Sequence, residues 1–197
     1  MPEDSKAFKI TDLPVHIFEK TVKPLGNDFR FTLRYVCKPF RALVDTWDPE
    51  YEEVEIGSNR KDVYLKFGDC SIRYNGDKRN QCVVTYDRAW PYNVLGVVDG
   101  DYMDVAIDDL YSILSHPKLK LSKFHTRQRD LLLNKKYSKV GVYEKFMEKL
   151  KLKLEGLKFK IHVENVHLEV KNSREDIKML KYFQPGTLKS IRLGGLA

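Results

Sequence analysis

The sequence has no long apolar run. Its longest charge-free stretch, Ala89 to Val98, is short and contains Pro91, whereas a membrane-spanning helix needs about 20 apolar residues. The first residues, Met-Pro-Glu-Asp-Ser-Lys, lack the basic and apolar regions of a secretory signal. We therefore expect a soluble protein without a membrane span, located in the cytoplasm, the nucleus or both.

Cysteine is also scarce. Cys37, Cys70 and Cys82 are an odd set with long gaps and form no Cys-x-x-Cys pair. A chain of 197 residues buries about 70% of its unfolded surface, so it needs neither disulfides nor a structural metal to fold. Three free thiols in a reducing compartment are the expected state of these residues.

The usual catalytic motifs are absent. The sequence contains no nucleophile elbow, phosphate loop, dinucleotide fingerprint or His-Glu-x-x-His motif. His162 and His167 are five residues apart on predicted strands, so we expect them to face opposite sides and to share no metal. The carboxylates from Asp99 to Asp109 do not fit an EF-hand and are expected at a helix start, where they complement the helix dipole. We predict no enzyme activity, no metal and no cofactor.

Basic residues gather in one part of the chain. The net charge is +7, and residues 117–160 contain 14 Lys and Arg against 4 Asp and Glu. In Lys118-Leu119-Lys120-Leu121 the lysines alternate with apolar residues, as on a strand with one solvated face. We call residues 118–160 the basic band. The sequence leaves three alternatives open for what it faces: solvent, an acidic protein partner or nucleic acid.

Hydrophobic periodicity predicts a change from helices to strands. Residues 12–25, 27–34 and 36–45 have helical spacing, and Asp12 is a predicted N-cap. Residues 51–86 alternate with period two, which predicts short antiparallel strands with one wet face and a hairpin at Phe67 to Cys70. The later part predicts helices and strands in turn, with helices at 103–114, 142–154 and 176–183 and strands at 119–124, 159–163, 166–170 and 188–193. The strands at 166–170 and 188–193 start 22 residues apart, a spacing typical of leucine-rich repeats.

The first helical block resembles an F-box. The matching residues are Leu13-Pro14-x-x-Ile17-Phe18, then Leu33-Arg34-x-Val36-Cys37-Lys38, then Phe40-Arg41-x-Leu43-Val44-Asp45. The resemblance implies a three-helix module on residues 9–48 that joins a Skp adaptor and, through it, a cullin ubiquitin ligase. The chain departs from the usual F-box pattern at His16, Pro39 and Phe40. The alternative is a helical cap that only closes the following sheet.

The remaining residues resemble the FTH domain of nematode F-box proteins. Leu43-Val-Asp-Thr-Trp47 precedes the short strands, and Leu180-Lys-Tyr-Phe183-x-Pro185-Gly186-Thr187-Leu188 is the more specific match. The family implies a protein-interaction region without catalytic residues. The expected fold is α+β, with the F-box on 9–48 and an FTH-like, leucine-rich-repeat-like strand–helix domain on 49–197. Because the pattern stops without a polar capping unit, we expect this domain to be truncated at its C-terminus.

The resulting functional prediction is a substrate adaptor in a Skp–cullin–F-box (SCF) ubiquitin ligase complex, within the ubiquitin conjugation pathway. The predicted adaptor-binding residues are Leu13, Pro14, Ile17, Phe18, Val36, Cys37 and Lys38. The predicted contacts to an acidic protein target are Lys118, Lys120, Lys158, Lys160, His162 and His167. The competing prediction is a non-catalytic nucleic-acid-binding protein that uses the basic band, although few aromatic residues are placed there for base stacking.

Overall fold

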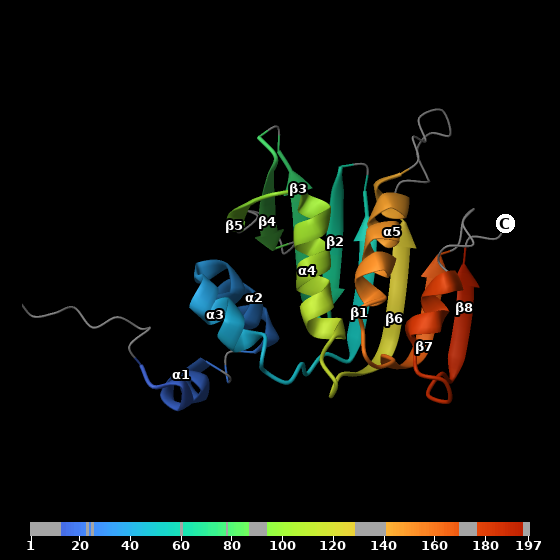
Figure 1. The fold of residues 1–197 in the computed structure, drawn as a ribbon, viewed down its shortest axis with the longest axis horizontal. Coiled ribbons are helices and arrows are strands. Elements are labelled where there is room, and N and C mark those ends of the chain that lie inside the picture. Colours follow the sequence, from blue (N-terminus) through green and yellow to red (C-terminus); the bar gives the residue numbers. More distant parts are fainter. Residues whose placement is uncertain are drawn as a thin grey trace, which may run out of the picture.

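Short helices start the chain and an eight-stranded mixed sheet follows, with its helices on one face (Figure 1). This computed structural model describes residues 13–22, 24, 26–59, 61–77, 79–86, 94–128, 141–169 and 177–194. The predicted cap at Asp12, residues 9–12 of the predicted F-box and part of the basic band, residues 129–140, lie outside this set. The described part is a mixed α+β structure with five α-helices.

The helical block contains α1 (Val15–Val22), α2 (Asn27–Val36) and α3 (Lys38–Val44). The backbone N–H groups of Ile17 and Phe18 both donate to the carbonyl of Pro14, which starts α1. Cys37 is extended, with φ −163°, and separates α2 from α3. Pro39 lies in the first turn of α3, where its missing N–H costs nothing. The three predicted helices are therefore present.

The first half of the sheet is an antiparallel meander. It contains β1 (Glu53–Ser58), β2 (Asp62–Phe67), β3 (Cys70–Gly76), β4 (Gln81–Tyr86) and β5 (Val94–Asp99). The β2–β3 hairpin pairs Phe67 with Cys70, and Gly68 has φ +57°, a left-handed conformation that glycine adopts easily. The predicted hairpin and the antiparallel pairing are confirmed, whereas β5 was not predicted.

The second half of the sheet is parallel. It contains β6 (Lys120–Gln128), β7 (His162–Glu169) and β8 (Ser190–Gly194), and β6 pairs with β1 in the order β5-β4-β3-β2-β1-β6-β7-β8. The helices α4 (Tyr102–Leu114) and α5 (Val142–Leu154) cover one face of the sheet. The 3₁₀ helix η5 (Lys178–Tyr182) leads toward β8. The predicted helices at 103–114 and 142–154 are confirmed.

Four neighbouring parallel strands share an apolar pattern, apolar-x-x-apolar-x-apolar. It reads Tyr51-x-x-Val54-x-Ile56 at β1 and recurs at Leu121, Val163 and Leu188, with Thr126 as the one polar member. The register aligns Val54, Phe124, Val166 and Ile191 in one row, and Ile56, Thr126, Leu168 and Leu193 in the next. The same face of each strand therefore points to the helices.

Two local predictions were wrong, and a third was right only in part. Residues 159–163 and 166–170 do not form two strands, because residues 162–169 make the single strand β7. The predicted helix at 176–183 is the short η5, and Asp176 lies outside the described residues. The 22-residue spacing is not a period: Asn165 of β7 lies 25 residues from its partner Ser190, and 43 residues from Ser122 at the preceding strand.

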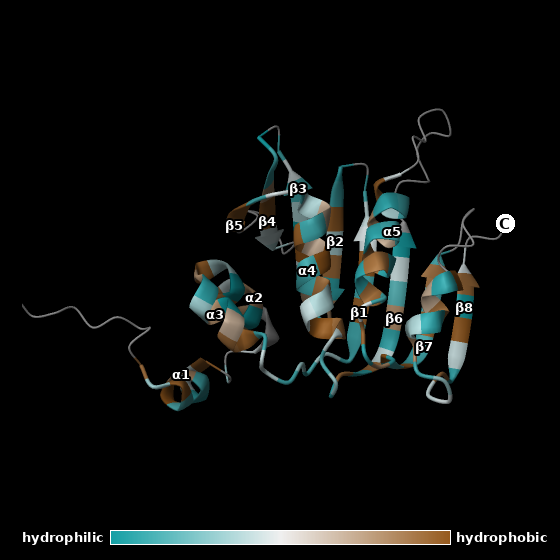
Figure 2. Ribbon diagram, viewed as in Figure 1, coloured by the Kyte–Doolittle hydropathy of each residue, from teal (hydrophilic) through white to brown (hydrophobic). Residues whose placement is uncertain are grey.

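The main core lies between the sheet and the covering helices. Ile56 and Leu65 from the sheet and Leu110 and Leu150 from α4 and α5 are fully buried there. A second, smaller cluster holds the helical block together through Phe18, Val22, Leu33, Phe40, Val44 and Trp47. Figure 2 shows the apolar residues of β8 in brown at the end of the sheet.

Candidate protein-interaction site

The predicted adaptor-binding residues surround the small N-terminal cluster. Leu13 and Cys37, from different ends of the block, are half-buried and pack against it. Phe18 is only 3% exposed and stacks on Phe40, with ring centroids 4.8 Å apart. Phe18 is therefore a core residue, which corrects its assignment to the contact surface.

The other predicted adaptor residues are accessible. Ile17 is 41% and Val36 59% exposed, and Pro14 and Lys38 are also exposed. Val15, which the sequence prediction omitted, is 56% exposed. These exposed apolar side chains are therefore available for contact with a partner.

A buried ion-pair centre attaches the helical block to the sheet. Asp109 of α4 accepts hydrogen bonds from Arg34 of α2, with Nε at 3.2 Å and a terminal nitrogen at 2.8 Å. The hydroxyls of Tyr35 and Tyr74 donate to its other oxygen, Tyr74 at 2.7 Å. Burial and the Asp109 charge raise the pKa of both tyrosines well above its ordinary value. These side chains come from three segments, so they fix α2 against α4 and β3.

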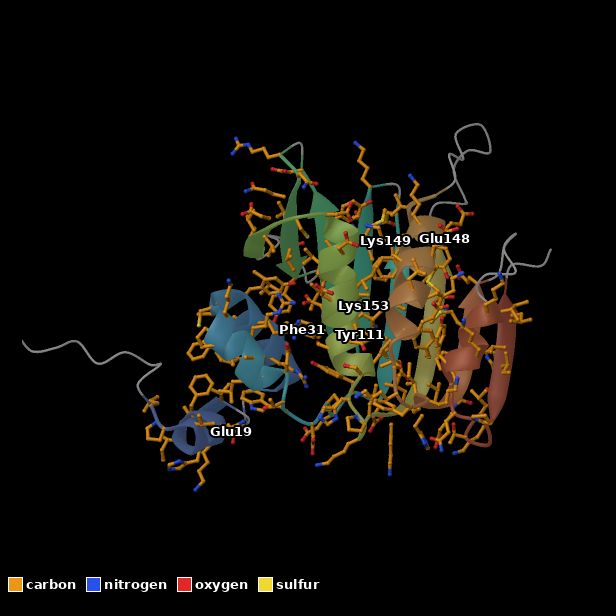
Figure 3. All side chains as sticks on the ribbon, viewed as in Figure 1. Glu19, Phe31, Tyr111, Glu148, Lys149 and Lys153 are labelled. Atoms are coloured by element: carbon orange, nitrogen blue, oxygen red, sulfur yellow. The ribbon has the colours of Figure 1, made fainter. Side chains whose placement is uncertain are left out.

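The same junction contains an aromatic stack. The ring of Phe31 on α2 lies 5.0 Å from that of Phe67 and 6.4 Å from that of Tyr51, measured between centroids. Phe31 is fully buried in the main core, and Figure 3 shows it between the helical block and α4. The helical block is thus packed onto the sheet, and the predicted boundary at residue 48 is crossed by core contacts.

Acidic residues from other segments neutralise much of the described basic band. Lys149 lies 2.8 Å from Asp104, and Lys153 lies 3.0 Å from Asp108. Both pairs join α5 to α4, and the Lys153 ammonium also lies 5.3 Å from the ring centroid of Tyr111 (Figure 3). Burial lowers the pKa of Lys149, but the hydrogen bond to Asp104 and the charges of Asp101 and Asp104 outweigh it and raise the pKa overall.

Lysines on the strand side of the band are paired as well. Lys118 lies 2.9 Å from Asp48, and Lys123 lies 3.9 Å from Glu53. Lys120 is exposed and is the register partner of His162. Of the predicted target contacts, the register therefore brings Lys120 and His162 together and leaves Lys118 occupied by Asp48.

His167 belongs to the uncovered face of the sheet. Its ring stacks on that of His125, with centroids 4.4 Å apart and an interplanar angle of 6°. Val163 and Val166 are both buried although they are three residues apart, so the alternation of buried and exposed residues is interrupted between them. His162 and His167 therefore share the opposite face, which corrects the prediction that they face opposite sides. Within the described residues, no group of three or more His, Cys, Asp or Glu side chains could hold a metal ion.

The remaining predicted contacts, Lys158 and Lys160, line a pocket where α5 ends and the chain turns into β7. This C-terminal pocket has a volume of about 360 Å³. Its apolar lining is Leu154, Leu157, Phe159 and Tyr182, and its charged lining is Glu155, Lys158, Lys160 and Lys181. The Tyr182 hydroxyl donates to the carbonyl of Lys151 at 3.0 Å and so joins η5 to α5.

The charges at the C-terminal pocket are unequally balanced. Lys181 forms an ion pair with Glu155 at 3.2 Å, and its ammonium lies 4.8 Å from the ring centroid of Tyr182. Hydrogen bonds to Tyr182 and Glu155 raise the pKa of Lys181. Lys160 donates to the carbonyl of Lys181. Among the described residues, no carboxylate pairs with Lys158 or Lys160, so two positive charges stay uncompensated at the pocket.

Comparison with known families finds one match in the second half of the chain. Residues 144–196 match the FTH domain. This region runs from α5 through β7 and η5 to β8 and includes the C-terminal pocket. The FTH domain is a protein-interaction domain associated with F-box proteins and not a known enzyme family. No curated protein and no solved structure matches the chain.

Sequence reasoning missed two of the residues that shape these sites. Asp109 was grouped with carboxylates at a helix start, but it lies nearly two turns further along α4 and is 1% exposed. Its position on the apolar side of α4, three residues after Ala106 and four before Ile113, was the available signal. Lys181 carried no such signal, because only the packing of η5 beside α5 brings it to the pocket. No helix in the described ranges is long and apolar enough to cross a bilayer.

Proposed function

We propose that this chain is the target-binding subunit of a Skp–cullin–F-box ubiquitin ligase. In this proposal α1–α3 bind the Skp adaptor, and the region from α5 to β8 binds a protein target. The observation that carries the proposal is the FTH match over residues 144–196, because this domain is associated with F-box proteins. The Leu13-Pro14 start of α1 and the uncovered apolar side chains of the helical block support the adaptor half.

The arrangement of the sheet supports a repeat scaffold for the target-binding half. Four parallel strands carry the same apolar pattern in register, and in the described residues all covering helices lie on one sheet face. Repeat proteins of this kind present extended surfaces to protein partners. The junction at Asp109 would hold such a scaffold in a fixed orientation relative to the adaptor.

The nucleic-acid alternative has less support. Lys118, Lys123, Lys149 and Lys153 of the basic band are paired with carboxylates. A phosphate backbone gains affinity by releasing counterions from many free cationic contacts. Part of the positive charge of the described band is therefore already compensated within the chain.

Capture of the chain by a purified Skp adaptor tests the proposal. We expect Ile17→Asp combined with Val36→Asp to weaken capture by about tenfold or more, because carboxylates would be buried in an apolar contact. Both side chains are exposed, so the substitution leaves the small core intact. Leu152→Asp, at a 70% exposed position on α5, is the matched control and should bind normally.

Two results would contradict the adaptor role. One is a lack of adaptor binding by the unmodified chain. The other is normal binding by the doubly substituted chain when circular dichroism shows that it is folded. Steeply salt-dependent binding of DNA or RNA without adaptor binding would favour the alternative.

A further inference from the structure

The C-terminal pocket combines an apolar floor with a local excess of positive charge. Leu154 is 1% and Tyr182 6% exposed, so both form a fixed base, while Phe159 is 36% exposed at its margin. Lys158 and Lys160 stand on either side of Phe159 in the chain. All three residues line the pocket, so charged and apolar contacts meet at one opening.

We propose that the C-terminal pocket binds an acidic protein segment that inserts one bulky apolar side chain between flanking carboxylates. The inference deepens the proposed target-binding role and rests on it, because it names the class of target and the residues that capture it. The apolar side chain would lie against Leu157 and Phe159. The carboxylates would pair with Lys158 and Lys160.

Charge complementarity predicts that the partner segment is negatively charged. Lys158 has neither an ion pair nor a hydrogen bond within the described residues, and Lys160 is held only by a neutral carbonyl. Elsewhere in this part of the chain, Lys149, Lys153 and Lys189 pair with carboxylates. The pocket is thus a place where a partner's carboxylate can pair without displacing an internal one.

The aromatic geometry favours a peptide over a nucleic acid base. The Lys181 ammonium already covers the Tyr182 ring, at 4.8 Å from its centroid, and the Tyr182 hydroxyl is bonded to Lys151. This ring is therefore not free to stack on a base, which is the usual contact for single-stranded nucleic acid. The volume of about 360 Å³ is enough for one large apolar side chain with its flanking backbone.

Fluorescence anisotropy with synthetic peptides on the full chain tests the inference. The probe is a labelled peptide of sequence Ser-Glu-Asp-Glu-Phe-Glu-Asp-Glu-Ser, compared with the same peptide carrying Ser in place of Phe. We expect Lys158→Glu with Lys160→Glu to weaken binding of the Phe peptide by about tenfold or more, because two attractions become repulsions. Phe159→Ser should weaken the Phe peptide and leave the Ser peptide unchanged.

Lys66→Glu with Lys145→Glu is the matched control. Both lysines are exposed and lie on β2 and on the first turn of α5, so the change in net charge is the same while the pocket is untouched. Its peptide affinity should fall much less than that of the pocket variant. Equal losses in the two variants would show that only net charge matters and would overturn the inference.

Two further results would also overturn it. They are a lack of peptide binding by the unmodified chain, and tighter binding of oligo(dT) than of the peptide with the same dependence on Lys158 and Lys160. Adaptor capture, measured on the same variants, should be unchanged by the pocket substitutions. Peptide binding without adaptor capture would therefore contradict only the proposed ligase role. Adaptor capture without peptide binding would contradict only the proposed binding of an acidic segment in the C-terminal pocket.

Discussion

Asp109 is a charged residue that the core holds almost free of solvent, with 1% of its surface exposed. Arg34 supplies the opposite charge, Tyr35 and Tyr74 supply two hydroxyl donors, and Arg41 lies 3.6 Å away. Such a group is tolerated because its lone pairs are satisfied and its charge is paired. The Asp109 centre fixes the orientation of the helical block on the sheet more than it stabilises the fold. The reason is that the cost of desolvating two charges offsets most of the attraction within a buried ion pair.

We expect Asp109→Asn to lower the free energy of unfolding by up to about 3–5 kcal/mol, because Arg34 would lose its fully buried counter-charge and keep only its ion pair with the less buried Asp45. Urea unfolding followed by fluorescence measures the change. Asp108→Asn, one residue earlier and half-exposed beside Lys153, should have little effect. Equal effects of the two substitutions would show that the Asp109 centre is not a special contact.

His125 makes stability depend on pH. Burial lowers its pKa, Glu55 and Glu169 raise it, and His167 and Lys123 lower it, with a net lowering from 6.5. Between the folded and unfolded pKa values the unfolded state binds more protons, so stability falls as pH falls below about 6.5. His116, whose pKa is also lowered mainly by burial, contributes in the same direction.

We expect His125→Gln to reduce the loss of unfolding free energy between pH of about 7.5 and about 5, because one of the two groups is removed. Denaturant unfolding at both pH values measures the slope, and His16→Gln on exposed α1 is the control. An unchanged slope in His125→Gln would show that burial does not lower the pKa of His125 as its surroundings indicate.

At the scale of elements, α4 starts one residue before the predicted position 103. Asp101 is its N-cap, and its side chain accepts hydrogen bonds from the backbone of Met103 at 2.8 Å and Asp104 at 3.3 Å. These contacts are local, so a carboxylate before an apolar periodic run is enough to predict them. η5 was predicted less well: helical spacing predicted a helix at 176–183, and among the described residues 178–182 form a short 3₁₀ helix.

We expect Asp101→Ala to lower the free energy of unfolding by about 1 kcal/mol, because two N–H groups at the start of α4 lose their acceptor. Asp101→Asn should cost much less, since asparagine also caps helices. Thermal and urea unfolding of the two variants measure the difference. Equal losses would mean that the charge of Asp101 next to Lys149, and not the cap, stabilises this end.

For the whole molecule, β8 is an incompletely covered edge. Ile191 and Leu193 are 47% and 43% exposed, whereas Val166 and Leu168, their register partners on β7, are 1% and 0% exposed. The strand pattern therefore continues to β8, while the covering of its apolar face does not. An exposed apolar edge strand is a site for association with another strand.

We expect the chain to associate with a second copy at high concentration, and Ile191→Lys with Leu193→Lys to reduce this association. Charged side chains on an edge strand oppose pairing between chains. Sedimentation velocity over a range of concentrations measures the effect, with Leu152→Lys as the control at an exposed helical position. A monomer at every concentration in the unmodified chain would contradict the expectation.

The sequence by itself determined the α+β class, the three N-terminal helices, the β2–β3 hairpin and the resemblance of residues 180–188 to the FTH domain. Each depends on periodicity, on turn residues such as Gly68, or on a local motif, and all of these act over a few neighbouring residues. The prediction of Lys158 and Lys160 as target contacts also depends on a local pattern, their alternation with Phe159 and Ile161, and it stays a prediction.

Only the tertiary structure decided which charges stay free and which apolar residues stay accessible. The basic band contains few acidic residues of its own, so its neutralisation by Asp48, Asp104 and Asp108 depends on segments brought together by the sheet and by the α4–α5 contact. The sequence predicted Phe18 as a contact residue, whereas in the structure its ring stacks on that of Phe40 in the small core. The interrupted alternation between Val163 and Val166 put His162 and His167 on one face, whereas a strict period of two would have put them on opposite faces.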